Sequence, residues 1–165
     1  MKYLRSNIVF QEIPNEISLA FEITNCPYRC KGCHSPELQQ DIGTELTPEL
    51  FRSFIHENMC NSQLLISCVL FLGGDHHHNE LIELCKIAKG YGLKTALYTG
   101  SNRVPKNILN VLDWIKLGGY DESKGGLSSE TTNQILKLVK DLTENQIDLP
   151  AEYSDIVDKD FWNLI

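Results

Sequence analysis

The spacing of apolar residues predicts four β-strands. Residues 17–24 (ISLAFEIT) carry a large apolar side chain at every second position, a period that is typical of a strand. Residues 64–72 (LLISCVLFL) are almost all apolar, as in a parallel strand that is buried on both faces. The shorter apolar segments Leu93–Tyr98 and Trp114–Leu117 predict two further strands.

Helical patterns lie between and after these strands. The Thr-Pro pair at 47–48 is typical of a helix N-cap followed by proline at the first helical position. Residues Asn79–Lys89 place apolar side chains on one helical face, and Gly90 is expected to end that helix. A short helix is predicted over Pro105–Leu112 and a longer one over Ser129–Leu142.

Strands that alternate with helices indicate an α/β fold with βαβ units and a mostly parallel sheet. A closed eight-stranded barrel needs about 250 residues, and this chain has 165. We therefore expect a partial, open (β/α) barrel. No linker, repeat or low-complexity segment interrupts the sequence, so residues 1–165 are expected to form one domain. The segment Leu149–Ile165 gives no clear pattern.

The ends of the predicted strands carry the unusual residues. Three strands end at residues 73–75 (GGD), 99–100 (TG) and 118–119 (GG), and the strand at 17–24 ends at a cysteine-rich loop. The carboxyl ends of parallel strands meet at one rim, where α/β proteins bind their ligands. The sequence therefore predicts one site to which four separate segments contribute.

The cysteine-rich loop is residues 25–34 (NCPYRCKGCH), with thiols at Cys26, Cys30 and Cys33. Iron–sulfur clusters are normally held by four cysteines. Three cysteines with no fourth nearby would leave one iron open to a small molecule, and an open metal position is typical of catalytic sites. The alternative is zinc bound by the three cysteines and His34. Structural zinc sites usually pair two short knuckles, and this sequence has one.

Composition narrows the possible partners and the compartment. The net charge is −7, and lysine and arginine are scattered, which argues against nucleic acid as a partner. No apolar run approaches the roughly 20 residues that span a bilayer, so no membrane association is expected. The first five residues lack the apolar core of a signal peptide. We therefore expect a cytoplasmic protein.

Two other groups of chemically versatile residues have simpler interpretations. The remaining cysteines, Cys60, Cys68 and Cys85, lie in apolar or helical contexts and are expected to be buried free thiols. The tract His76–His78 resembles a metal site. Because consecutive side chains diverge, we expect an exposed loop that leads into the next helix.

The stretch from Ile17 to Leu38 resembles the radical S-adenosylmethionine enzymes, whose signature is three cysteines at this spacing. The resemblance implies a [4Fe–4S] cluster held by Cys26, Cys30 and Cys33, and a partial barrel of the type that this superfamily uses. The open iron would chelate S-adenosylmethionine through its amino and carboxylate groups. One-electron reduction would then cleave the cofactor to a 5′-deoxyadenosyl radical.

The other rim segments acquire roles through the same resemblance. Gly73, Gly74 and Asp75 are similar to the Gly-Gly-Glu motif that holds the methionine amine, with aspartate in place of the commoner glutamate. Thr99 is expected to hydrogen-bond the nucleoside or the methionine moiety. Lys116, or alternatively Asp113, is expected to meet the methionine carboxylate or the ribose.

Residues 25–37, 71–75, 97–100 and 115–134 most closely resemble the activating proteins of class III anaerobic ribonucleotide reductase. Gly32 supports this choice, because most radical enzymes place an aromatic residue there against the adenine. Tyr28 is a candidate for that packing here. The resemblance implies hydrogen abstraction from a glycine Cα of the reductase's large subunit and a low-potential electron donor such as flavodoxin. The segment Gly118–Leu127 is a candidate docking surface.

Two alternatives stay open at this point. The first is another radical S-adenosylmethionine enzyme, such as a formate-lyase-type activase or a small-molecule synthase. The second is a non-catalytic zinc or iron–sulfur binding module. Cofactor cleavage separates the second alternative from the enzymes, and a radical on the reductase separates the two kinds of enzyme.

Overall fold

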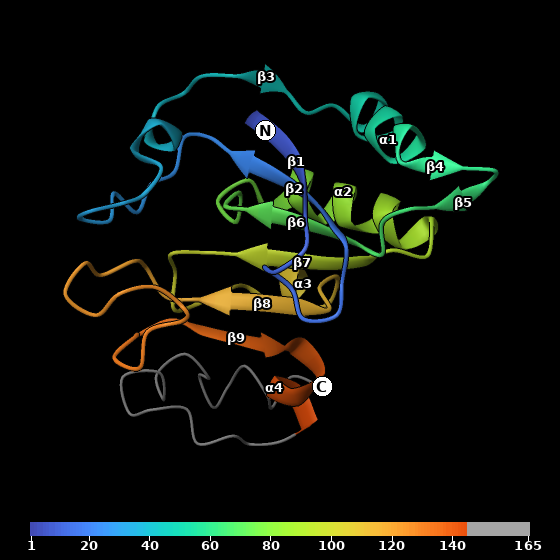
Figure 1. The fold of residues 1–165 in the computed structure, drawn as a ribbon. Helices are drawn as coiled ribbons and strands as arrows, with labels where there is room; N and C mark the ends of the chain where they lie inside the picture. Colours follow the sequence, from blue (N-terminus) through green and yellow to red (C-terminus); the bar gives the residue numbers. More distant parts are fainter. Residues whose placement is uncertain (145–165) are drawn as a thin grey trace.

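The structure is a computed structural model that describes residues 1–144 of the chain. Its centre is a sheet of strand order β3-β1-β2-β6-β7-β8-β9. The four inner strands run parallel, as predicted (Figure 1). They are β2 (Ser18–Ile23), β6 (Cys68–Leu72), β7 (Lys94–Tyr98) and β8 (Trp114–Leu117).

Antiparallel strands flank this parallel centre on both sides. Strand β1 (Lys2–Val9) pairs with β2 and with the short β3 (Thr44–Glu45), and β9 (Ile135–Leu138) pairs with β8. The described part of the sheet thus ends at β3 on one side and at β9 on the other. The protein is a mixed α/β fold around a mostly parallel central sheet, and this sheet is open among residues 1–144.

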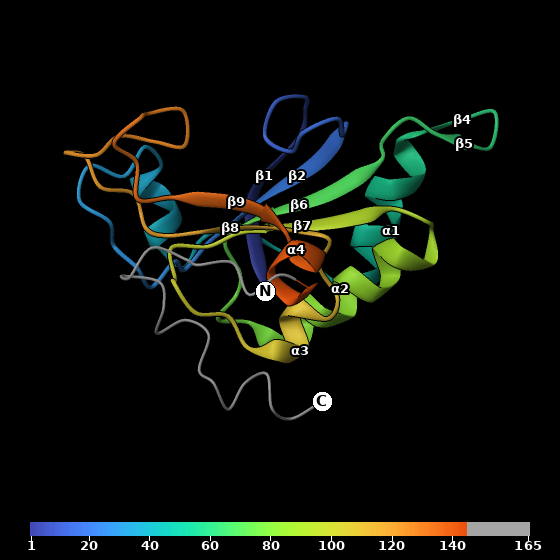
Figure 2. The same ribbon diagram turned by 90° about the horizontal axis from the view of Figure 1, so that it is seen from below.

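Three helices cover one face of the sheet, as Figure 2 shows. They are α1 (Pro48–Glu57), α2 (His78–Gly90) and the short α3 (Lys106–Leu109). Thr47 caps α1 as predicted, because its side-chain oxygen accepts a hydrogen bond from the Leu50 N–H at 3.2 Å. The remaining elements are the 3₁₀ helix η1 (Pro36–Gln39), the hairpin of β4 (Met59–Cys60) and β5 (Gln63–Leu64), and α4 (Val139–Glu144).

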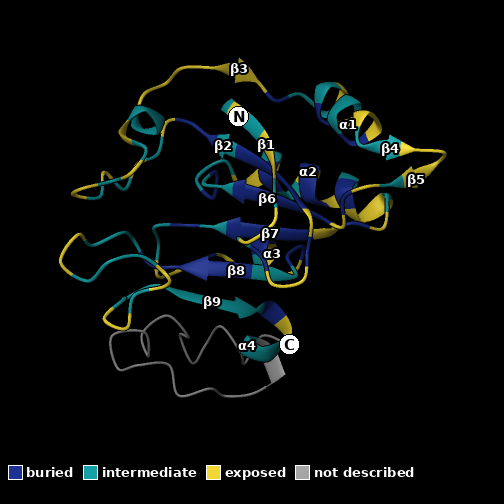
Figure 3. Ribbon diagram, in the orientation of Figure 1, coloured by how far each residue is buried: buried dark blue, intermediate teal, exposed yellow. Residues whose placement is uncertain are grey.

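Most residues of the inner strands are buried, as are residues on the sheet-facing side of α1 and α2 (Figure 3). Phe21, Phe51 and Phe71 are fully buried there, and their ring centroids lie 5.5–6.0 Å apart. Rings at these separations are within the favourable range for aromatic pairs. This helix-covered face holds most of the apolar core.

The opposite face of the sheet is covered differently. Its buried strand residues are mostly small, and the segment 10–17 between β1 and β2 folds over them and buries Ile13. The Tyr98 hydroxyl donates a hydrogen bond to the Glu12 carbonyl oxygen, and Lys94 pairs with Glu16. These contacts hold the segment against this face of the sheet, mainly over the amino ends of β2, β6 and β7.

The predicted helix over Ser129–Leu142 is wrong. Residues 135–138 form β9, which pairs antiparallel with β8, and a helix begins only at Val139. Strand β8 would otherwise be an edge with unpaired backbone groups. That pairing is a tertiary interaction, and the spacing of apolar residues does not report it.

Smaller corrections concern strand β6, strand β1 and Gly90. The predicted strand over 64–72 begins only at Cys68, since Gln63–Leu64 belongs to a separate hairpin, and β1 was not predicted. Helix α2 ends at Gly90, as predicted, but the left-handed residue after it is Gly92, at φ +78°. Within the described residues, no helix has both the length and the apolar character to cross a membrane.

The three cysteines outside the loop differ from one another. Cys68 and Cys85 are buried, as predicted, and burial raises the pKa of each thiol to about 12. Cys60 lies exposed in the β4–β5 hairpin, so the prediction of a buried thiol is wrong there. The segment Leu149–Ile165 lies outside the described residues.

Candidate cofactor site at the carboxyl ends of the strands

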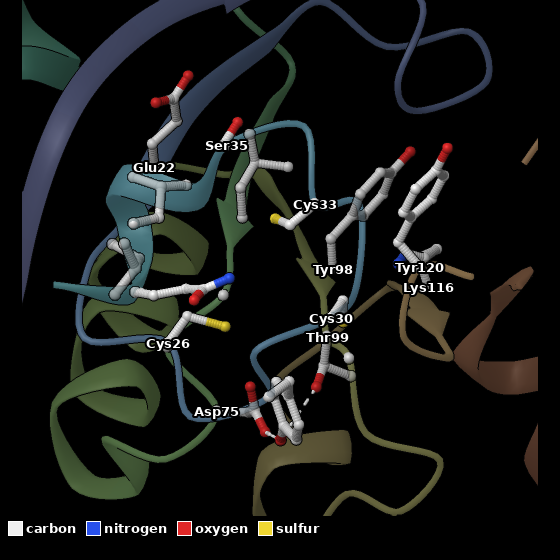
Figure 4. A pocket seen from close by; sticks show the side chains of 18 of the residues that line it. Glu22, Cys26, Cys30, Cys33, Ser35, Asp75, Tyr98, Thr99, Lys116 and Tyr120 are labelled. Carbon is white, nitrogen blue, oxygen red and sulfur yellow. Dashed lines mark hydrogen bonds between the residues drawn. The ribbon is translucent and has the colours of Figure 1, made fainter. Parts of the chain in front are cut away.

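A cavity of about 450 Å³ lies at the carboxyl ends of the parallel strands. Its wall is made by the segments that follow β2, β6 and β7 and by the end of β8 (Figure 4). The structure brings together here eight of the residues singled out in the sequence: Cys26, Cys30, Cys33, Gly73, Gly74, Asp75, Thr99 and Lys116. The convergence follows from the parallel register of the four strands.

The cysteine loop leaves β2 through a left-handed turn. Asn25 has φ +60°, and the N–H groups of Asn25 and Cys26 donate to the carbonyl oxygens of Gln40 and Leu38, both at 2.9 Å. These bonds tie the start of the loop to η1. Within the loop the Cys33 N–H donates to the Cys30 carbonyl oxygen at 3.2 Å, so the second and third cysteines share one tight turn.

The three thiols are free, and Figure 4 shows the sulfur atoms of Cys26 and Cys33 directed into the cavity. The Cys30 sulfur lies near Gly119, where an added Cβ would stand 3.1 Å from it. Burial raises the pKa of Cys26, and the neighbouring Cys30 and Cys33 raise it further through charge repulsion.

This set of donors fits an iron–sulfur cluster. Three thiols on one loop favour soft, thiolate-binding metal centres, and a cationic centre would relieve the repulsion among three thiolates. Within residues 1–144 no three His, Cys, Asp or Glu side chains are arranged to hold a metal ion.

The Gly-Gly-Asp segment follows β6 with two left-handed residues, Gly73 at φ +94° and Gly74 at φ +99°. These positive φ values favour glycine at both positions, and a Cβ on Gly74 would also lie 2.9 Å from the Met1 sulfur. The turn carries the Asp75 side chain into the cavity wall, where it is 6% exposed. Its Oδ2 accepts a hydrogen bond from the Tyr28 hydroxyl, whereas Oδ1 is buried without a protein partner.

Thr99, at the end of β7, is buried and points toward the same network. Its hydroxyl donates to the Tyr28 oxygen at 3.4 Å and accepts from the Ser101 N–H at 2.9 Å. Burial, followed by the hydrogen bond to Asp75, raises the pKa of Tyr28 to about 12. The Tyr28 hydroxyl therefore stays protonated and acts as a donor at neutral pH.

Lys116 brings an amine to the cavity from β8. Its Nζ donates to the Gly118 carbonyl oxygen at 2.9 Å and lies 5.6 Å from the centre of the Tyr98 ring, a cation–π distance. Burial lowers the pKa of Lys116 to about 8. The alternative, Asp113, pairs with Lys89 and the Thr95 N–H and is absent from the cavity wall, so its predicted role is wrong.

The wall also contains residues that the sequence did not single out. Among them are Glu22, Tyr98, Tyr120 and Gln134. Gln134 donates its Nε2–H to the Gly118 carbonyl oxygen at 3.2 Å, the same oxygen that Lys116 contacts. Alternation along the strands could have identified two of them. Glu22 and Tyr98 are the last side chains of β2 and β7 on the face that leads into the cavity.

His76 departs from the exposed loop predicted for His76–His78. It is only partly exposed and lines the cavity, and both of its ring nitrogens are buried without a hydrogen-bond partner. Burial lowers the pKa of His76. His77 pairs with Glu80 at 3.1 Å, and His78 is exposed at the start of α2. The prediction therefore holds for His78 and is wrong for His76.

Comparison with known proteins supplies one match. A family model described as a 4Fe-4S single cluster domain matches residues 17–130, which include all three loop cysteines. No curated protein and no solved structure matches the chain.

Proposed function

Because this chain belongs to the 4Fe-4S single cluster domain family, we propose that it is a radical S-adenosylmethionine enzyme. We further propose that it activates an anaerobic ribonucleotide reductase. One observation carries the proposal: the cysteine loop shares one cavity with the Gly-Gly-Asp turn and with the ends of β7 and β8. The arrangement places the polar side chains of Asp75, Thr99 and Lys116 in the same cavity as the three thiols.

The cavity residues divide the work of binding. Cys26, Cys30 and Cys33 would hold the [4Fe–4S] cluster. Bound together, cluster and S-adenosylmethionine supply a one-electron reductive cleavage, whose 5′-deoxyadenosyl radical takes a hydrogen atom from a partner glycine. Gly73 and Gly74 let the backbone approach the ligand closely.

Asp75, Thr99 and Lys116 would orient the methionine and nucleoside parts. The unpartnered Oδ1 of Asp75 is a buried acceptor suited to an ammonium group. The buried amine of Lys116 is suited to a carboxylate. The Thr99 hydroxyl adds a neutral donor and acceptor on the wall between them.

The choice of partner is supported by the open side of the site. The proposed fold is a partial, open (β/α) barrel, whose free edge would admit a glycine loop from a large partner protein. Leu127 is 36% exposed and lines the cavity, so the segment Gly118–Leu127 is suited to contact that partner. Gly32 has φ +71°, and an added Cβ there would crowd Glu122 at 3.0 Å, which supports glycine at this position.

The proposal places the protein in the cytoplasm with a low-potential electron donor such as flavodoxin. The first test uses anaerobically reconstituted protein that is reduced with dithionite and mixed with S-adenosylmethionine. We expect brown protein with about four irons that releases methionine and 5′-deoxyadenosine. Addition of the reductase large subunit should then give a glycyl radical signal in electron paramagnetic resonance.

Each failure of this test has a distinct meaning. Cofactor cleavage without a radical on the reductase would refute the activase assignment and favour another radical S-adenosylmethionine enzyme. Protein that holds the cluster but never cleaves the cofactor would refute the enzyme assignment altogether. Partner affinity that is unchanged after disruption of residues 125–127 would refute the docking role of that segment.

A further inference from the structure

Tyr28 connects three segments of the cavity wall. It stands between Cys26 and Cys30 in the cysteine loop, and its hydroxyl hydrogen-bonds Asp75 after β6 and Thr99 at the end of β7. Among the described side-chain hydrogen bonds, these are the ones that join the cysteine loop to the other two strand ends. The position of the loop and the position of the carboxylate are therefore linked through one phenol.

The Tyr28 ring is fixed by a backbone contact as well as by its hydroxyl. It packs against Gly100, where an added Cβ would lie 2.7 Å from two ring carbons. Any side chain at residue 100 would displace the ring. The glycine thus allows the close approach that places the hydroxyl between Asp75 and Thr99.

The hydrogen bond has a consequence for the Asp75 carboxylate. The Tyr28 hydroxyl donates to Oδ2 of Asp75, whereas Oδ1 has no hydrogen-bond partner. The residue is only 6% exposed, so water does not reach Oδ1. Buried polar atoms are nearly always hydrogen-bonded, and one that is not costs free energy. A ligand with a cationic N–H donor would satisfy this atom.

We propose that Tyr28 is a positioning residue that holds Asp75 so that Oδ1 faces the ammonium group of an α-amino acid ligand. The proposal rests on the proposed function, in which that ligand is the methionine part of S-adenosylmethionine. Tyr28 acts through Asp75 and through the packing of the loop. This role differs from the packing against adenine for which the sequence made Tyr28 a candidate.

The test compares two ligands on cluster-loaded, unreduced protein, so that no turnover occurs. In Tyr28→Phe, which keeps the ring on Gly100, S-adenosylmethionine should bind about tenfold more weakly, as expected for a lost hydrogen bond to a charged group. Binding of 5′-methylthioadenosine, which lacks the amino acid part, should not change. An equal loss for both ligands, or no loss for either, would overturn the proposal.

A double-mutant cycle and a matched control sharpen the result. If Tyr28 acts through Asp75, then Tyr28→Phe should have little further effect in an Asp75→Asn background, and additive losses would contradict the proposal. The control is Tyr91→Phe, which also removes a hydroxyl that makes one side-chain hydrogen bond, to His56. Tyr91 is not part of the cavity wall, so its loss should leave both affinities and the iron content unchanged.

A second measurement separates this proposal from the proposed function. Wild-type protein that carries four irons and binds no S-adenosylmethionine would refute the function. The positioning role is then decided by hydrogen exchange in the cluster-free chain. Faster amide exchange at residues 26–33 and 73–75 in Tyr28→Phe would support the link between loop and carboxylate, and unchanged exchange would overturn it.

Discussion

The two halves of the sheet face opposite the helices contrast sharply. At the amino ends of β2, β6 and β7 (the covered half), the segment 10–17 buries Ile13 against mostly small strand residues. At the carboxyl ends of the same strands (the open half), this face borders the candidate cofactor site. Leu70 of β6 and Ala96 of β7 lie in the cluster around Ile13. Two residues further along these strands, Leu72 and Tyr98 contact that cluster and also line the cavity. On β8, Trp114 packs against the cluster and Lys116 lines the cavity.

This difference shows how little sequence separates core from site. Side chains two residues apart on a strand share a face, so one step along each strand is enough to move from packing to chemistry. In β8 that step leads from Trp114 to Lys116. Both halves are built on the same hydrogen-bonded strands.

The largest expected effect comes from the cysteines of the open half. Replacement of Cys30 by alanine should abolish the cluster and the activity while the fold survives, because Cys30 is partly exposed and is not part of the apolar core. Iron analysis together with circular dichroism measures both outcomes. Loss of iron in Cys68→Ala or Cys85→Ala would show that the ligands have been assigned wrongly.

The other cysteines provide matched controls for this experiment. Cys68→Ala and Cys85→Ala should each lower the free energy of unfolding by about 1 kcal/mol, since each removes a buried sulfur atom. Cys60→Ala should have almost no effect, because Cys60 is exposed.

The next effect concerns the covered half. Ile13 is 1% exposed, so Ile13→Ala should lower the free energy of unfolding by about 2–5 kcal/mol, and Ile13→Val by about 0.5–1.5 kcal/mol. Urea denaturation measures both values. Iron content should stay at the wild-type level in each variant. A loss of iron in Ile13→Val would show that the two halves are not separable.

The sequence predicted the open half better than the covered half. Buried parallel strands are continuous apolar runs that stop at glycines, so 73–75 and 99–100 mark the rim without any tertiary information. The segment 10–17 contains the apolar residues Phe10, Ile13 and Ile17, and of these only Ile13 is buried, a difference that the local pattern does not indicate. Its burial depends on a hollow made by small side chains from β2, β6 and β7.

Edge strands and side-chain environments were missed for a similar reason. Strands β1 and β9 are defined by pairing with residues far along the chain or by the need to cover an edge. His76 looked like part of an exposed histidine tract, and its burial comes from the turn at 73–75. The link from Tyr28 to Asp75 spans 47 residues, and no local pattern reports it.

A smaller effect is expected from the charge in the open half. The pKa of Lys116 falls from 10.5 to about 8 on folding because of burial. Between these values the unfolded chain binds more protons than the folded chain, so the free energy of unfolding rises with pH in this window. Below about pH 8 the cost of the buried charge is fully present.

Lys116→Met should therefore stabilise the cluster-free chain at pH 7, by about 1–3 kcal/mol. The advantage over wild type should shrink as the pH approaches 10.5. Urea denaturation of both proteins across this range gives the difference, in which the other titrating groups largely cancel. A difference that does not depend on pH would show that Lys116 is uncharged or solvated in the folded chain.

The smallest expected effect is on the free energy of unfolding when a glycine near either end of β7 is replaced by alanine. Gly90 ends helix α2, which leads toward the start of β7, and an added Cβ would meet no atom within 4 Å. Gly90→Ala should raise the free energy of unfolding by about 0.5–1 kcal/mol, because alanine loses less backbone entropy on folding. Gly100→Ala, at the open end, should instead destabilise the chain by crowding the Tyr28 ring. Thermal denaturation of the two variants measures both effects. Stabilisation by both substitutions would mean that the Tyr28 ring can move away from residue 100, and would contradict a fixed position of this ring in the cavity wall.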